Sequence, residues 1–253
     1  MAVKSKLLMI HNYSMHAGKV LHWDTSDNEA LYLKNIKEPK SYEQLLHLGF
    51  LDTQIHYKYN SHGFRTDEFD NDIEVLCFGC SFTMGTGIHA EDTWPSQFEH
   101  KTGLKTANLG LAGSSNDTVF RLARYYLPLL KPKYAIWVQT DMSRIEILED
   151  PPAISLNILP ADMHSPYAND QFIKTWFSVD SNQELQLQKN TLAFQMLCSL
   201  ENITPIIIPR NEVPFLDYAR DLMHPGRLSY EKLAKTMVDI LYKDATLTVL
   251  TTE

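Results

Sequence analysis

The sequence predicts an α/β protein in which a mostly parallel sheet is covered by helices on both faces. Short apolar runs of strand length recur along the chain from about residue 73 onward. Longer segments lie between them, and their apolar residues repeat with helical spacing. Strands that alternate with helices are typical of parallel sheets, because the crossover connections place the helices on the two faces.

The first 70 residues are weakly patterned, apart from a predicted helix near residues 41–48 and a predicted loop at 57–65. Beyond them we expect a strand at 73–78, a polar loop at 79–87, a helix at 94–102, a strand at 105–109, a turn at 110–115, a helix at 117–127, a strand at 134–138, an irregular insertion at 149–180, a helix at 181–200, a strand at 205–208 and a helix at 228–242.

Glycine and proline set most of these boundaries. Gly79 ends the first strand, and Gly103 closes the helix that follows the polar loop. Pro128 and Pro132 are expected to stop the helix at 117–127, because proline removes a backbone donor and clashes with the preceding turn. The insertion at 149–180 has no clean period and contains several prolines.

Composition excludes several classes of protein. The chain has 253 residues, of which 44% are hydrophobic and 21% charged, so wholesale disorder is not expected. Lys and Arg number 23 against 31 Asp and Glu, giving a net charge of −8, so we expect no nucleic-acid partner. The three cysteines do not form a disulfide scaffold.

We expect no targeting signal at the N-terminus. Its longest apolar run, residues 7–10, is too short for a secretory signal or a membrane span. We therefore expect a cytoplasmic protein, although a virion-associated protein released by lysis would also lack a signal. The expected division is an N-terminal extension at 1–56, of unassigned role, and a domain at 57–246 that contains the insertion at 149–180.

Three short motifs could carry chemistry. GCSFTMG at 79–85 follows a buried strand, so the Ser81 hydroxyl could be presented at the sheet edge as a nucleophile. DLMHPG at 221–226 places an acid three residues before a histidine, which lets Asp221 accept the Nδ1–H of His224 and leave Nε2 as a base. NLGLAGSSND at 108–117 is a strand-to-helix turn with two glycines. Alone, the first motif is equally compatible with a turn and a helix-capping serine, the second is more simply a surface loop whose Asp caps a turn, and the third is a common strand-to-helix turn.

Taken together and in this order, the motifs resemble the blocks of the SGNH hydrolases, the GDSL-like esterase family. The first block here has Cys where many members have Asp, and WP at 94–95 and NSHGFR at 60–65 also resemble segments of relatives. The resemblance covers roughly residues 57–243. It implies a flavodoxin-like three-layer α/β/α sandwich with a small parallel sheet.

The resemblance also implies roles for individual residues. Ser81 would be the nucleophile, His224 the general base and then acid, and Asp221 the carboxylate that orients the histidine. The backbone N–H groups of Ser81 and Gly113 would form two arms of an oxyanion hole. Neither a metal nor another cofactor is implied, and the scattered His11, His16 and His22 show no metal-ligand spacing.

The chain departs from the family in the third block. The family supplies an Asn side chain there as the third oxyanion donor, whereas this sequence has VQTDMSR at 138–144. Asp141 lies nearest the expected position, but an ionised carboxylate cannot donate a hydrogen bond. The substitute donor would then be Asn116, Thr140 or Ser143; otherwise the site is weakened.

Other residues near these motifs have open alternatives. Cys77 and Cys80 form a C-x-x-C that could be a redox pair, and Cys80 could replace Ser81 as nucleophile. We do not favour a redox pair, because Cys77 falls in the predicted buried strand, and we favour Ser81 as the nucleophile because it matches the serine position of the family that the motifs resemble. Arg144 either binds an anionic group of the substrate or pairs with Glu146.

These observations predict a serine ester hydrolase that removes a short acyl group, such as acetyl, from a carbohydrate or another polar carrier. The expected partner is therefore a small-molecule or glycan ester, and no oligomeric state is predicted. Two alternatives remain open. One is an O-acyltransferase with the same three side chains. The other is a catalytically impaired glycan-binding or structural protein, for instance of a virion, on the same fold.

Overall fold

A four-stranded parallel sheet forms the centre of the protein. A computed structural model describes residues 11–148, 155–158 and 171–250. The sheet order is β4-β3-β5-β8, and every neighbouring pair runs parallel. Its strands are β3 (Val75–Phe78), β4 (Thr106–Asn108), β5 (Tyr134–Val138) and β8 (Thr204–Ile208). The structure thus confirms the predicted α/β class and the four predicted sheet strands.

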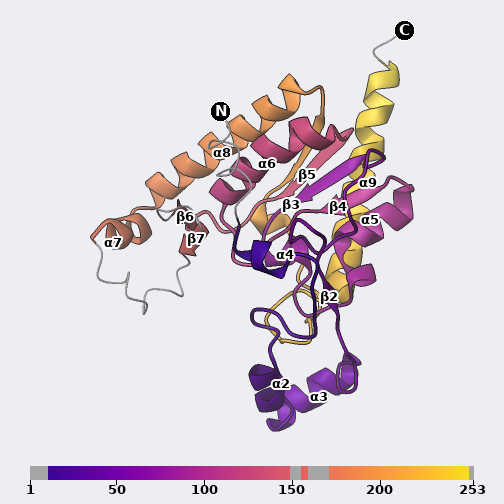
Figure 1. Cartoon of the computed structure of the whole chain (residues 1–253), viewed down its shortest axis with the longest axis vertical. Helices are drawn as coiled ribbons and strands as arrows, with labels where there is room; N and C mark the ends of the chain where they lie inside the picture. The colour runs from indigo at the N-terminus through magenta and orange to yellow at the C-terminus, as the bar shows by residue number, and fades with distance from the viewer. Residues whose placement is uncertain (1–10, 149–154, 159–170, 251–253) are drawn as a thin grey trace.

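Two pairs of helices enclose this sheet (Figure 1). On one face α5 (Trp94–Thr102) packs against α9 (Arg227–Leu250), and on the other α6 (Asn116–Leu130) packs against α8 (Asp180–Leu200). Trp94, Trp137 and Phe194 are completely buried between these layers. The three-layer sandwich predicted from the sequence is therefore present.

The N-terminal segment contributes to the same hydrophobic core. It contains η1 (Asn12–His16), β1 (Val20–Leu21), α2 (Glu29–Asn35), α3 (Pro39–His47) and β2 (Tyr57–Lys58). Strands β1 and β2 pair antiparallel, so the predicted loop at 57–65 was wrong in its first two residues. The predicted helix near 41–48 corresponds to α3, whose Leu45 is buried in the main cluster. The division at residue 56 stays a prediction.

The segment expected as a polar loop at 79–87 contains a helix. Helix α4 (Ser81–Met84) starts directly after β3, and all four of its side chains are buried. Cys80 has extended backbone geometry and Gly85 is left-handed, so one turn is closed at both ends. A second short helix, η2 (Ala90–Asp92), precedes α5.

Helix α6 passes through the proline that was expected to stop it. Pro128 lies within the helix, which ends only at Leu130, with Lys131 in left-handed geometry as its cap. Tyr126 and Leu127 are buried in the core. The helix loses one backbone hydrogen bond at Pro128 near its end, and the packing of these neighbours favours its continuation.

Part of the insertion predicted as irregular is regular. Within the insertion, β7 (Ser155–Ile158) pairs antiparallel with β6 (Ile145–Leu148), which directly precedes the insertion, and α7 (Gln171–Ser178) precedes α8. The hairpin was missed because its two strands stabilise each other and lie outside the main sheet. Ile173 and Trp176 are the buried residues of α7. Residues 149–154 and 159–170 of the insertion lie outside the described residues.

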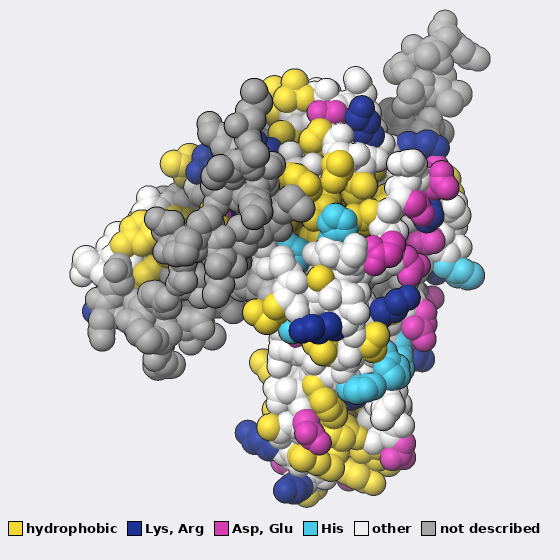
Figure 2. Space-filling model, viewed as in Figure 1, with side chains coloured by type: hydrophobic (Ala, Val, Ile, Leu, Met, Phe, Trp, Pro, Cys, Tyr) yellow, Lys and Arg dark blue, Asp and Glu magenta, His cyan; other side chains and the backbone are white. Residues whose placement is uncertain are grey.

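The surface carries mixed charge. Figure 2 shows Lys and Arg side chains dispersed among Asp and Glu on the face in view, without a continuous basic field. Of the helices in the described ranges, none combines the length and apolar character needed to cross a bilayer. Among the same residues, His, Cys, Asp and Glu side chains form no group of three or more arranged to hold a metal ion.

Candidate active site

Ser81 lies at the carboxyl end of a central strand. Strand β3 is buried along its whole length, and Ser81 is the first residue of α4, with 5% of its surface exposed. Between them Gly79 makes the sharp turn. A Cβ at Gly79 would lie 2.2 Å from Thr83 Oγ1 and 2.9 Å from the carbonyl oxygen of Val138, so only glycine fits.

The loop before α9 brings an acid and a histidine into one turn. Leu222 has a left-handed φ of 55°, which folds the chain back over Asp221. Asp221 Oδ1 accepts the backbone N–H groups of Met223 and His224, both at 3.0 Å. Its other oxygen, Oδ2, is therefore left to face the imidazole, and His224 Nδ1 lies 2.6 Å from it.

The imidazole connects the two motifs. His224 Nε2 lies 2.8 Å from Ser81 Oγ, although the residues are 143 positions apart. When Nδ1 carries the proton toward Asp221, the lone pair of Nε2 faces the serine hydroxyl. Phe82 packs edge-on against the imidazole with ring centroids 5.5 Å apart. Asp221, His224 and Ser81 thus form one continuous line of hydrogen bonds, a geometry able to activate a hydroxyl nucleophile.

Asp221 is held in its charged form. Burial alone would raise the pKa of this carboxyl, whose side chain has no exposed surface. The hydrogen bond and charge of His224 and the hydroxyl of Ser26 outweigh burial and lower the pKa below its usual value. Asp221 is therefore ionised at neutral pH and can stabilise a protonated imidazole.

Gly113 lies beside the nucleophile on the neighbouring turn. Leu111 N–H and Ser114 Oγ both donate to the Gly79 carbonyl, at 3.1 and 3.0 Å, which ties this turn to the residue two positions before Ser81. Gly113 has a left-handed φ of 78°. Within the described part of the chain, no hydrogen bond uses the N–H of Ser81 or of Gly113. Both donors are thus available to a bound oxygen.

Three of the four candidates for the third donor are already engaged. The Asn116 amide donates to the Thr140 carbonyl and accepts the Thr140 N–H, at 3.2 and 3.0 Å. Ser143 gives its hydroxyl proton to Asp141 at 2.6 Å. Burial would raise the pKa of Asp141, but the Ser143 hydrogen bonds lower it below its usual value, so the carboxylate has no proton to donate.

Thr140 is the candidate whose hydroxyl is not engaged with an oxygen or nitrogen among the described residues. Its side chain is 2% exposed, and Oγ1 makes no hydrogen bond to an oxygen or nitrogen of the described residues. The nearby Cys80 thiol is buried, which raises its pKa, while the charge of Arg144 and the Thr140 hydroxyl lower it below its usual value. The Thr140 hydroxyl therefore faces only a weak sulfur partner, and an oxygen bound in the site would be a stronger acceptor.

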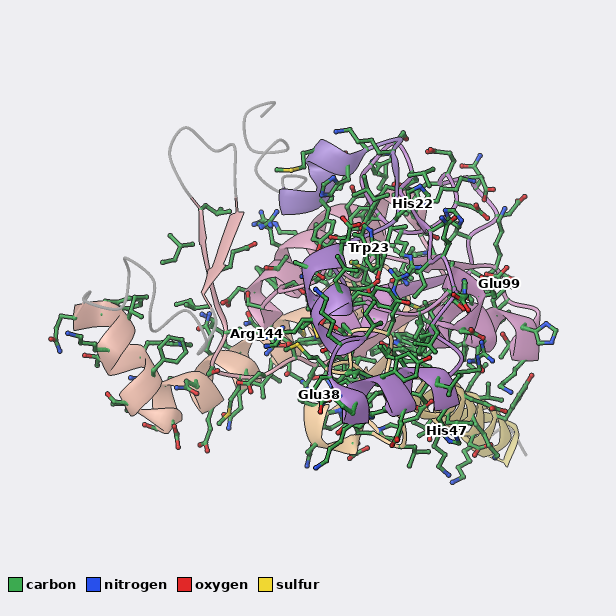
Figure 3. All side chains as sticks on the ribbon, turned by 90° about the horizontal axis from the view of Figure 1, so that it is seen from below. His22, Trp23, Glu38, His47, Glu99 and Arg144 are labelled. Carbon is green, nitrogen blue, oxygen red and sulfur yellow. The ribbon has the colours of Figure 1, made fainter. Side chains whose placement is uncertain are left out.

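The structure also bears on the alternatives raised for Cys77, Cys80 and Arg144. All three cysteines of the chain are free thiols. Cys80 Sγ lies 4.0 Å from Ser81 Oγ, and the imidazole bonds the serine oxygen. Glu146 is occupied by Arg121 at 2.7 Å, so it is not the partner expected for Arg144. Arg144 instead donates to the Ser114 carbonyl at 3.3 Å, beside the β6–β7 hairpin (Figure 3).

Two contacts of the site were not anticipated from the sequence. Arg65 of the NSHGFR segment donates to the carbonyls of Gly85 and Ile88, and so fixes the chain after α4. Ser26, from the N-terminal segment, donates to Asp221 at 2.6 Å. Arg65 could have been found from the sequence, because it lies in the NSHGFR segment that resembles a segment of relatives. No motif near Ser26 indicates its contact with Asp221, which is 195 residues away along the chain.

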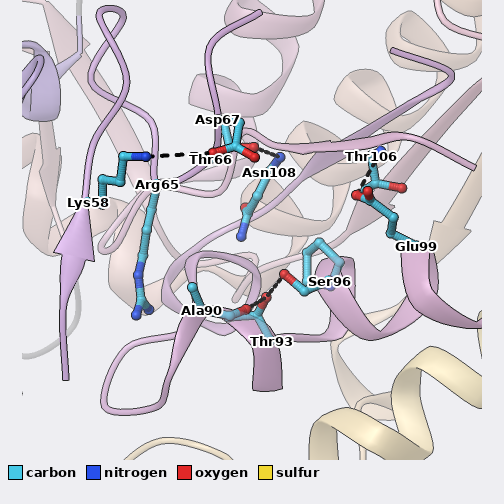
Figure 4. Close-up of a pocket in the computed structure, with 11 residues that line it drawn as sticks. Lys58, Arg65, Thr66, Asp67, Ala90, Thr93, Ser96, Glu99, Thr106 and Asn108 are labelled. Carbon is cyan, nitrogen blue, oxygen red and sulfur yellow. Dashed lines mark hydrogen bonds and ion pairs between the residues drawn. The ribbon is translucent and has the colours of Figure 1, made fainter. Parts of the chain in front are cut away.

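Two cavities of the described structure lie away from Ser81. One, of about 160 Å³, is open to solvent between β2, α5 and β4, with Lys58, Arg65 and Glu99 in its lining (Figure 4). The other, of about 210 Å³, is lined by residues that include Trp23, Tyr32 and Arg220. Neither is lined by the nucleophile, the acid or the histidine.

Comparison with known proteins finds similarity among solved structures. No protein-family profile matches the chain, and no curated protein matches it. A lipolytic protein of the G-D-S-L family from Desulfitobacterium hafniense is similar, with 14% identity and a TM-score of 0.35, over 64% of this chain and 96% of that one. The cold-active esterase EstA from Pseudoalteromonas is similar at 13% identity and a TM-score of 0.36, over 70% and 100% of the two chains.

A Clostridium thermocellum family 3 carbohydrate esterase is also similar. The two share 13% identity and a TM-score of 0.37, over 68% of this chain and 98% of the esterase.

Proposed function

We propose that this chain is a serine ester hydrolase of the SGNH type. The single observation that carries the proposal is the line of hydrogen bonds from Asp221 through His224 to Ser81, with distances of 2.6 and 2.8 Å. It joins a buried carboxylate, an imidazole and a hydroxyl at the carboxyl end of a parallel strand, where α/β folds place their sites.

In the proposed reaction Ser81 Oγ attacks the acyl carbonyl carbon while its proton passes to His224 Nε2. The tetrahedral intermediate collapses, and the carrier oxygen leaves with that proton. Water then gives a proton to His224 as its oxygen attacks the acyl-serine ester, and Ser81 departs and regains a proton. Asp221 holds Nδ1–H and stabilises the imidazolium in both steps.

The oxyanion of each intermediate needs donors. We assign this role to the N–H groups of Ser81 and Gly113 and to the hydroxyl of Thr140, since the other candidates are engaged elsewhere. Thr140→Val removes the hydroxyl and keeps the shape, and it should lower kcat roughly a hundredfold or more. Thr140→Ser should keep most of the activity; equal activity of Thr140→Val and the wild type would remove this residue from the assignment.

The nucleophile is tested with 4-nitrophenyl acetate and with a fluorophosphonate that labels activated serines. Ser81→Ala should lower hydrolysis roughly a thousandfold or more and abolish labelling. Cys80→Ala should still be labelled, which separates the two neighbouring residues. Ser199→Ala, on the exposed side of α8, is the surface control. Equal hydrolysis by Ser81→Ala and the wild type would overturn the proposal and favour a binding or structural role.

We further propose a short acyl group, such as acetyl, on a polar or carbohydrate carrier. In support, the insertion at 149–180 contains no long apolar run in its sequence and mixes aromatic with polar residues. Hydrolysis should therefore fall along a series of 4-nitrophenyl esters from acetate to octanoate, and a rise along the series would contradict the short acyl group. Product analysis with a sugar acceptor present distinguishes hydrolysis from acyl transfer.

A further inference from the structure

The turn that carries Ser26 is built rigidly. Asp24 and Asp27 exchange both backbone hydrogen bonds, at 2.8 and 3.0 Å, which leaves Thr25 and Ser26 at the tip. The Asn28 side chain donates to the carbonyls of both tip residues, at 3.0 and 3.2 Å, and also caps α2. The position of the Ser26 hydroxyl is therefore set by the turn itself.

Buried groups fasten this turn to the loop of the site. Asp27, 1% exposed, forms a bidentate pair with Arg220, with distances of 2.8 and 2.7 Å. Arg220 directly precedes Asp221 in the chain, and its guanidinium stacks over Trp23 at 4.0 Å. Trp23, which directly precedes the turn, is thus in contact with Arg220 of the loop. Tyr57 also donates to Asp27, at 2.5 Å.

The Ser26 hydroxyl reaches the one oxygen of Asp221 that faces the imidazole. It donates to Oδ2 at 2.6 Å and lies 3.4 Å from His224 Nδ1. Oδ1 is already taken by two backbone N–H groups. Asp221 therefore has donors on both oxygens, and the carboxylate cannot rotate away from the histidine without breaking one of them.

We propose that Ser26 is a positioning residue of the active site, so that the N-terminal segment completes the machinery of the domain it covers. Its hydroxyl fixes Asp221 Oδ2 and, through it, the imidazole that faces Ser81. This inference rests on the proposed hydrolase function. It assigns to the N-terminal segment a role in the chemical step, because Ser26 contacts Asp221 and His224. Ser26 acts through these two residues and does not itself contact the substrate.

The test uses full-length Ser26→Ala, Ser26→Thr and the surface control Ser199→Ala. Ser26→Ala should lower kcat for 4-nitrophenyl acetate roughly tenfold or more at unchanged KM, the size expected for one hydrogen bond to a charged group. Ser26→Thr restores a hydroxyl at the same Cβ and should recover most of kcat. A purely structural turn would give equal kcat in all folded variants, and that result would overturn the proposal.

A second measurement does not depend on activity. The proton between His224 Nδ1 and Asp221 Oδ2 should give a far-downfield proton resonance, identified by its loss in His224→Ala. Ser26→Ala should shift or broaden this resonance, and Ser199→Ala should leave it in place. Absence of the resonance in the wild type, or an unchanged position in Ser26→Ala, contradicts the assignment. Failure of hydrolysis alone, with this shift present, would instead overturn the proposed function.

Discussion

The buried pair of Asp27 and Arg220 offers a direct test of how the N-terminal segment is held. The two side chains are 1% and 3% exposed and meet through two hydrogen bonds. Asp27→Asn keeps the shape of the side chain and removes its charge. Arg220 would then be a buried cation with only neutral acceptors, among them the carbonyls of Thr53 and His22, at 3.0 and 3.1 Å.

Breaking such a pair from one side costs about 3–5 kcal/mol of unfolding free energy, because desolvation of the remaining charge is no longer compensated. We expect a loss of this size for Asp27→Asn in urea denaturation followed by circular dichroism. In the double variant Asp27→Leu with Arg220→Met, which replaces both charges by apolar groups, part of the stability should return.

The exposed pair of Lys58 and Asp67 is the matched control. Its atoms lie 3.9 Å apart, and its side chains are 74% and 94% exposed. Asp67→Asn should change stability by less than about 0.5 kcal/mol, since solvent screens the pair. A loss below about 1 kcal/mol for Asp27→Asn, equal to that of the control, would refute the idea that this charge pair anchors the turn.

Three further outcomes follow from burial and geometry. Burial raises the pKa of Asp24 to about 7, so the wild type loses unfolding free energy as the pH rises through about 4 to 7. Relative to the wild type, Asp24→Asn should become more stable over that interval by on the order of 4 kcal/mol, measured by urea denaturation at pH 4 and at pH 7. A stability difference that is the same at both pH values would contradict this expectation. Phe194→Ala empties a fully buried site and should cost about 3–5 kcal/mol by the same assay, against under about 0.5 for the 63% exposed Leu192→Ala. Gly110→Ala would place a Cβ 2.4 Å from the Met84 backbone nitrogen, so it should displace α4 and lower both thermal stability and fluorophosphonate labelling; wild-type labelling would disprove that.

The alternation of apolar strands and amphipathic segments was sufficient to predict the sheet and its helix layers. Strand β5 and helix α5 matched their predicted ranges because each has a strong local boundary signal: Pro132 comes shortly before the strand, and Gly103 caps the helix. The prediction that Pro128 ends the helix was wrong, because α6 continues through it and its neighbours Tyr126 and Leu127 are buried in the core. Strand β6 was not predicted, because it pairs only with β7 in a hairpin outside the main sheet.

The sequence also identified Ser81, Asp221 and His224 as candidates, because each lies in a short motif of recognisable chemistry. It could not choose the third oxyanion donor. Asn116, Thr140 and Ser143 each carry a suitable side chain, and the choice depends on which donors the folded chain has already used. Hydrogen-bond occupancy is a property of the packed structure, and no spacing in the sequence encodes it.

The linear sequence determined the layers of the fold and the residue types of the site, since strand and helix periodicity and short motifs act over a few neighbouring residues. Tertiary structure alone brings the N-terminal segment into contact with Asp221. Ser26 contacts Asp221, which is 195 residues away, because the buried Asp27 next to it binds Tyr57 and Arg220. These bonds hold the turn of Ser26 against the loop of Asp221. Such a contact is fixed by burial and charge pairing in three dimensions, where position along the chain carries no information.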